Sequence, residues 1–182
     1  MTRLERIGPE PLVAVEWAGE GPLLVFLHGI GGNRTNWHAQ LAHFSGRFTA
    51  VAWDARGYGD SDDYDGPLDF ADFSADLLKV IAHFGRARVH LCGLSMGGRI
   101  ALDFWRRHPD KVASLVLADT SAGSAEAQDP ARIEAFLTLR RQPLLDGKTP
   151  ADLAPELVKA IAGPHIGAAE LAHLTASLAA LR

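Results

Sequence analysis

The sequence predicts an α/β fold in which a parallel sheet of about five strands carries helices on both faces and is followed by a helical layer. Three observations support this prediction. Apolar segments of strand length alternate with amphipathic segments of helical length as far as Asp119. One strand segment, Leu23–Leu27, is apolar at every position, which is typical of a strand buried on both faces. After Gly123 only helical patterns follow.

The expected strands end at polar or glycine-rich turns, which is where a chain leaves a sheet. The fourth strand leads directly into a glycine-containing turn, and the fifth ends at Asp119. Because a helical segment separates most neighbouring strands, we expect parallel βαβ units. The five expected strands are Leu12–Trp17, Leu23–Leu27, Phe48–Trp53, Val89–Cys92 and Ser114–Ala118.

Helices are indicated by spacing and by end signals. Apolar residues at helical spacing begin at Trp37. Asp69 can cap a second helix, whose single apolar stripe is stopped by Gly85. A third helix, Gly98–His108, ends at Pro109 because a residue before proline disfavours helical backbone.

The C-terminal block contains three expected helices and no expected strand. They comprise Ile133–Arg141, a helix capped at Thr149, and a helix with leucines at three- and four-residue steps from Leu171. We therefore divide the chain into a core of residues 1–123 and a helical cap or lid of residues 124–182.

The composition excludes several classes of function. The 182 residues carry a net charge of −4 without a basic stripe, so we expect no nucleic-acid partner. No apolar run approaches the length of a membrane span, and the N-terminus has no apolar signal region, so we expect a cytoplasmic protein without a membrane partner. The single Cys92 excludes an intramolecular disulfide and a cysteine-rich metal site, and we expect no metal or cofactor.

The segment Gly93–Gly97 matches G-x-S-x-G between an expected strand and an expected helix. Glycines two residues on either side of a serine allow a tight turn that exposes the hydroxyl, and the helix N-terminus favours a developing negative charge. This context makes Ser95 the candidate nucleophile. The glycine-rich loop His28–Gly32 also follows a buried strand, so the backbone N–H groups of Ile30 and Met96 are the candidate oxyanion donors.

One other glycine-containing segment is interpreted differently, and two phosphate-binding patterns are absent. The segment Asp54–Ser61, a glycine-rich turn after a strand, is interpreted as scaffolding around the site. Neither of the phosphate-binding patterns G-x-x-x-x-G-K-[ST] and G-x-G-x-x-G is present, which disfavours a nucleotide site.

These three segments, HGIGG, DARGYGDS and GLSMGG in this order, resemble the α/β-hydrolase superfamily, and most of all 3-oxoadipate enol-lactonases and related carboxylesterases. The resemblance covers Leu12 to Asp119, with the helical block as the cap. It implies that Ser95 is the nucleophile and that Ile30 and Met96 form the oxyanion hole. A carboxylate nucleophile, as in dehalogenases of this fold, is disfavoured by Ser95.

The resemblance also implies two further strands that bear an acid and a histidine, and we find no such segment before Arg182. Three explanations stay open. The chain is an inert fragment; or Asp119 serves as the acid and His165 or His173 as the base; or another chain supplies the missing groups. In the last case the strand ending at Asp119 leaves an exposed edge, which predicts a homo-oligomer.

The expected function is a serine hydrolase that cleaves a small carboxylic ester or lactone through an acyl-enzyme on Ser95. The alternative is a non-catalytic hydrolase-fold module, or half of a split enzyme, that acts by binding or by complementation. The residues expected to contact the substrate are His28, Gly29, Trp37, Phe136 and Leu139.

Overall fold

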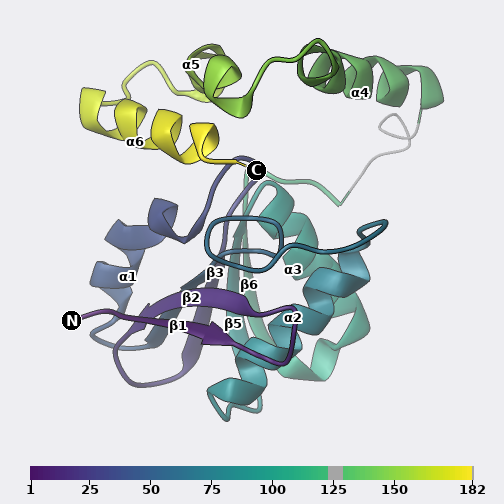
Figure 1. Cartoon of the computed structure of the whole chain (residues 1–182). Coiled ribbons are helices and arrows are strands. Elements are labelled where there is room, and N and C mark those ends of the chain that lie inside the picture. Colours follow the sequence, from purple (N-terminus) through teal and green to yellow (C-terminus); the bar gives the residue numbers. More distant parts are fainter. Residues whose placement is uncertain (123–128, 182) are drawn as a thin grey trace. The chain divides into compact units, whose positions relative to one another are not determined.

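The computed structural model describes residues 1–122 and 129–181, which form two compact units, Met1–Thr120 and Ser121–Arg182 (Figure 1). The boundary predicted between residues 123 and 124 lies outside the described residues. Within them, no helix is both long enough and apolar enough to span a membrane.

The first unit is built around one mixed sheet of six strands in the order β1-β2-β4-β3-β5-β6. The four strands β4, β3, β5 and β6 run parallel, whereas β1 pairs antiparallel with β2, and β2 pairs antiparallel with β4. The strands are β1 (Arg3–Ile7), β2 (Val13–Ala18), β3 (Leu23–Leu27), β4 (Thr49–Trp53), β5 (Val89–Leu94) and β6 (Val112–Ala118).

The α/β class with flanking helices is confirmed, and two details of the expected parallel sheet of about five strands differ. The sheet is mixed, and β1 is an additional strand. Its sequence, Arg3–Ile7, carries three charged residues and only one buried residue, because an antiparallel strand at a sheet edge can face water. Such a strand lacks the apolar run by which a buried strand is identified.

Helices cover both faces of this sheet, and β3 is buried between them. Val25 packs in a core with residues of α2 and α3, whereas Phe26 packs in a second core with Trp37 and Leu41. Successive side chains of a strand point to opposite faces, which explains why Leu23–Leu27 is apolar throughout. The helical elements of this unit are η1 (Arg34–Trp37), α1 (His38–Phe44), α2 (Phe70–His83), α3 (Met96–Arg107) and η2 (Pro109–Lys111).

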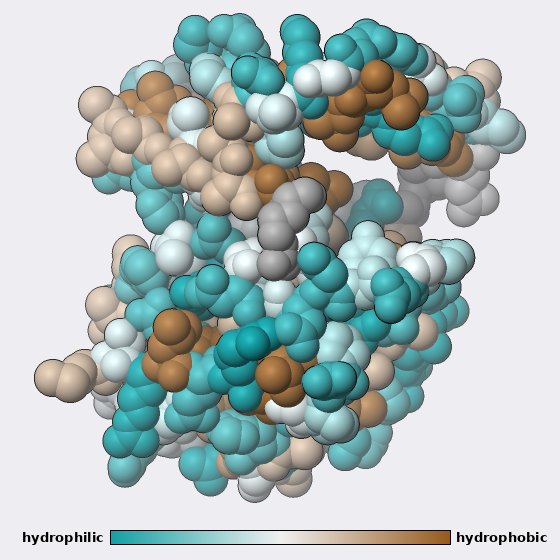
Figure 2. Space-filling view, in the orientation of Figure 1, coloured by the Kyte–Doolittle hydropathy of each residue, from teal (hydrophilic) through white to brown (hydrophobic). Residues whose placement is uncertain are grey.

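The described part of the second unit is helical: α4 (Pro130–Leu145), α5 (Pro150–Ile161) and α6 (Ala168–Ala179). A small core joins α5 and α6 through Ala154, Val158 and Leu178. Phe136 and Leu139 of α4 are exposed, and Figure 2 shows apolar surface over this helix. That this unit acts as a cap stays a prediction.

Candidate active site

Ser95 occupies a sharp turn between β5 and α3 and is exposed. Its backbone has φ 51° and ψ −111°, and among the described residues only Ser95 and Asp119 are non-glycine residues with positive φ. A non-glycine residue in such a conformation costs about 1–3 kcal/mol and persists only where the surroundings enforce it. The predicted strand–turn–helix context of Ser95 is therefore present.

The glycines on either side of Ser95 are required by close approaches of the backbone. A Cβ atom on Gly93 would overlap the backbone of Gly97, and a Cβ on Gly97 would overlap the carbonyl group of Leu27, at the end of β3. The turn can thus close, and α3 can start against β3, only when both positions lack a side chain.

The backbone of Ser95 is tied to the end of β6 and to α3. Its N–H donates to the Ala118 carbonyl at 3.0 Å, and its own carbonyl accepts from Gly98 N at 3.0 Å and from Thr120 Oγ1 at 2.7 Å. These bonds hold the strained turn from both sides.

The loop after β3 lies directly against this turn. A Cβ on Gly29 would come within 3.3 Å of the Ser95 Cβ. The two predicted oxyanion donors directly follow Gly29 and Ser95 in the chain. They are Ile30, whose side chain is exposed, and Met96, the first residue of α3. A helix offers no carbonyl partner to its first N–H groups, so the Met96 N–H is available to an anion.

His28 is buried and both of its ring nitrogens are engaged by backbone groups. Nε2 accepts a hydrogen bond from Ala55 N at 3.0 Å, which leaves the proton on Nδ1 to donate to the Gly29 carbonyl at 2.8 Å. Burial lowers the pKa of His28 by more than the Gly29 bond and the charge of Asp54 raise it. The neutral ring therefore joins the loop after β3 to the loop after β4, and no ring nitrogen remains for a proton from Ser95.

A network of charged groups fixes the same two loops. The Asp54 carboxylate is fully buried and accepts from the Arg34 backbone at 2.7 Å, from the Asp60 backbone at 2.9 Å and from the Arg34 guanidinium. Burial opposes the charge of Arg34, but Asp54 and Asp60 raise its pKa on balance. A second pair joins Arg56 to buried Asp76 of α2, with Nε–Oδ2 at 2.7 Å and Nη2–Oδ1 at 2.8 Å. These contacts favour the interpretation of Asp54–Ser61 as scaffolding.

Asp119 lies at the same end of the sheet as Ser95, where the parallel strands β5 and β6 stop. Strands β5 and β6 run parallel with Leu94 opposite Ala118, so both strands end one residue before these two positions. Asp119 is exposed and has φ 44°. Its assignment as the catalytic acid stays a prediction.

Four other predicted site residues lie in the second unit. His165 is exposed in the turn after α5, and His173 is exposed on α6. Phe136 and Leu139 are exposed on α4, and the Arg140 guanidinium stacks on the Phe136 ring at 4.9 Å. These four residues belong to a different unit from Ser95, and their roles stay predictions.

Trp37, predicted to contact the substrate, is a core residue. Only 9% of it is exposed, and its ring stacks on Phe26 with 5.0 Å between centroids. This packing accounts for an aromatic residue at the position, and it leaves little of the ring for a ligand.

Three residues that were not singled out in the sequence, Arg34, Tyr58 and Thr120, contact residues of the candidate site or its loops. Tyr58 packs edge-on to His28, with ring centroids 4.9 Å apart, and its hydroxyl lies 3.8 Å from the Met96 sulfur. Burial raises the pKa of Tyr58. Arg34 could have been noticed in the sequence, because it is a cation that closely follows a glycine-rich loop. The roles of Tyr58 and Thr120 could not, since their contacts depend on tertiary packing.

A family model described as the alpha/beta hydrolase fold matches residues 22–154, and the chain belongs to this family. It is 31% identical over 138 residues to 2-(acetamidomethylene)succinate hydrolase of Mesorhizobium japonicum, which covers 67% of this chain and 50% of that protein. It is 29% identical over 120 residues to 3-oxoadipate enol-lactonase 2 of Acinetobacter baylyi, which covers 64% of this chain and 45% of that protein.

Solved structures agree with this assignment. A thermophilic esterase from Thermogutta terrifontis aligns with a TM-score of 0.78 at 27% identity, over 98% of this chain and 67% of that one. The chain spans about half the length of the curated relatives it matches. The resemblance to the superfamily is confirmed.

Proposed function

We propose that this chain provides the nucleophile and the oxyanion hole of a serine hydrolase that cleaves a small carboxylic ester or lactone. The observation that carries the proposal is the strained turn at Ser95 with Gly29 against it. The Ser95 side chain on this turn is exposed, so its hydroxyl is accessible to a substrate. The ester and lactone hydrolases among the relatives support the substrate class.

In the proposed reaction, Ser95 Oγ loses its proton to a base and attacks the carbonyl carbon. The N–H groups of Ile30 and Met96 stabilise the oxyanion of the tetrahedral intermediate. The intermediate then expels the alcohol group, which takes up the proton, and leaves an acyl-enzyme that water hydrolyses. For the base and its acid we retain the predictions made from the sequence: His165 or His173, with Asp119.

A second candidate function is a binding module or half-enzyme that turns over substrate only with a partner. One observation favours it: both ring nitrogens of His28 are occupied by backbone groups. A serine without a base is a poor nucleophile at neutral pH, so this candidate predicts an intact but unreactive Ser95.

Labelling with a fluorophosphonate, read by intact mass, separates the two candidates. Ser114→Ala is the matched control, because Ser114 is exposed and already has a histidine nitrogen, His90 Nδ1, at 2.8 Å, but lies within strand β6 and has no positive φ. We expect one label per chain, retained in Ser114→Ala and lost in Ser95→Ala, together with hydrolysis of a short-chain p-nitrophenyl ester.

If the folded chain takes no label and hydrolyses no ester, the proposal that it acts alone is wrong. If it is active, His165→Gln, His173→Gln and Asp119→Asn identify the base and the acid. A predicted residue whose variant keeps full turnover has no such role.

A further inference from the structure

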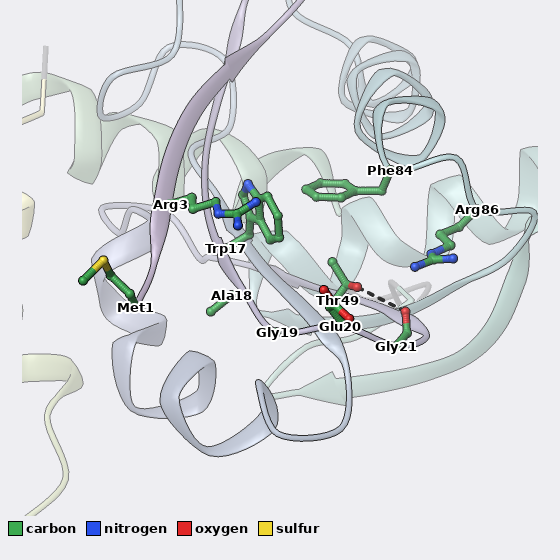
Figure 3. A pocket seen from close by; sticks show the side chains of 10 residues that line it. All are labelled: Met1, Arg3, Trp17, Ala18, Gly19, Glu20, Gly21, Thr49, Phe84 and Arg86. Atoms are coloured by element: carbon green, nitrogen blue, oxygen red, sulfur yellow. Dashed lines mark hydrogen bonds between the residues drawn. The ribbon is translucent and has the colours of Figure 1, made fainter.

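A hollow lies at the end of the sheet opposite to Ser95. It has a volume of about 540 Å³ and is lined by the turn Gly19–Gly21 before β3, by Thr49 at the start of β4, and by residues that follow α2 (Figure 3). Parallel strands β3 and β4 begin here, whereas Ser95 follows the last residue of β5. The hollow is therefore separate from the candidate active site, and its volume is typical of a small-molecule site.

One wall of the hollow is aromatic. The rings of Trp17 and Phe84 meet edge to face, with centroids 5.3 Å apart and planes at 82°. The indole N–H of Trp17 donates to Glu5 Oε1 at 3.1 Å, which fixes the ring. Together the two rings give the hollow an apolar, aromatic wall.

Two arginines carry unneutralised positive charge at the hollow. The Arg3 guanidinium stacks over the Trp17 ring, 4.8 Å from its centroid, and this geometry leaves its N–H groups directed outward in the plane. Figure 3 shows Arg86 on the other side with its guanidinium directed inward. Within the described part of the chain, neither guanidinium pairs with a carboxylate.

The charge balance restricts the ligand. Glu20 also lines the hollow, together with Met1, which bears the amino group of the chain, so positive groups outnumber the one carboxylate. This balance favours a ligand that carries an oxyanion group. Arginine binds carboxylate and phosphate oxygens through paired N–H donors.

We propose that this hollow binds a small ligand that has a flat apolar body and one carboxylate or phosphate group. The body packs on Trp17 and Phe84, and the oxyanion is held by Arg3 and Arg86. The site is distinct from Ser95 and does not depend on hydrolase activity.

The test follows the indole N–H signal of Trp17 by two-dimensional NMR of the full chain, with Trp17→Phe to assign it among the four tryptophans. The probes are benzoate, phenyl phosphate, phenol and inorganic phosphate. Benzoate and phenyl phosphate are expected to shift this signal saturably, one of them more tightly, which identifies the preferred oxyanion. Phenol and inorganic phosphate each lack half of the recognised chemistry and should bind at least about tenfold more weakly.

Variants locate the site and keep the experiment decisive. Arg86→Met should weaken binding by about tenfold or more, and Arg86→Lys by less, because charge is kept while the paired donors are lost. Arg106→Met removes the same charge from α3 and should change nothing, as should Ser95→Ala. A Trp17 signal that no probe moves, or that phenol moves as strongly as benzoate, or that Arg86→Met leaves fully responsive, overturns the proposal.

Discussion

Gly97 lies directly against the carbonyl group of Leu27, so that the helix behind Ser95 begins on the end of the neighbouring strand. No side chain fits at Gly97, because a Cβ atom there would overlap backbone atoms of Leu27 and His28. The position of the nucleophile relative to the loop after β3 thus depends on a contact between two pieces of main chain.

Gly97→Ala is therefore expected to be strongly destabilising. The added methyl group must displace β3 or α3, which corresponds to the upper end of overpacking costs, about 3 kcal/mol in the free energy of unfolding. Urea denaturation measures this loss, with Gly46→Ala as the control, because a Cβ at Gly46 meets nothing within 4 Å. Equal stabilities of the two variants would contradict the described contact.

Asp54→Asn and Asp60→Asn compare the loss of a buried charge with the loss of an exposed one. Asp54 is fully buried and holds Arg34, so its loss leaves a half-buried guanidinium with Asp60 alone. We expect a loss of about 3 kcal/mol, the lower end for breaking a buried pair. Asp60→Asn, at a side chain that is 61% exposed, should cost less than about 1 kcal/mol. Comparable losses in thermal denaturation would show that Asp54 does not carry the network.

Protonation of His28 should destabilise the fold as pH falls. Its pKa is lowered in the folded chain, so below about 6.5 the unfolded chain takes up a proton that the folded chain does not. This contribution to stability is complete above pH 6.5 and declines as pH falls through the interval below it. We expect a smaller pH dependence of the unfolding free energy in His28→Asn, although that variant is less stable at every pH. A pH dependence in His28→Asn equal to that of the wild type would contradict this prediction.

The main elements could be predicted from the sequence where one physical cause dominates. β3 and β4 are apolar because they are buried on both faces, and the cap at Asp69 is seen as predicted, with its side chain accepting from Ala71 N at 2.8 Å. β1 could not be predicted, since its charged residues satisfy an exposed edge rather than a core.

Part of the candidate site could likewise be predicted from the sequence, and part could not. The turn at Ser95 has a sequence signal because only glycine tolerates the close approaches around it. The contact of Tyr58 with His28 and the bond from Thr120 to the Ser95 carbonyl have no such signal, because they join residues far apart in the chain. Trp37 shows the limit of residue type as evidence, since an aromatic side chain near a site serves equally well in the core.

The two edges of the sheet differ in a way that predicts self-association at one of them. β1 carries charges that discourage edge pairing, whereas β6, the opposite edge, has no charged residue and exposes 54% of Val116 and 43% of Leu117. A second copy offers the same unpaired strand, so β6 of two chains can pair around a two-fold axis. We expect a dimer by light scattering after size exclusion, and a monomer for Val116→Lys. Leu4→Lys, at an exposed position on β1, should remain a dimer. A wild-type chain that is monomeric at every concentration would refute pairing through β6.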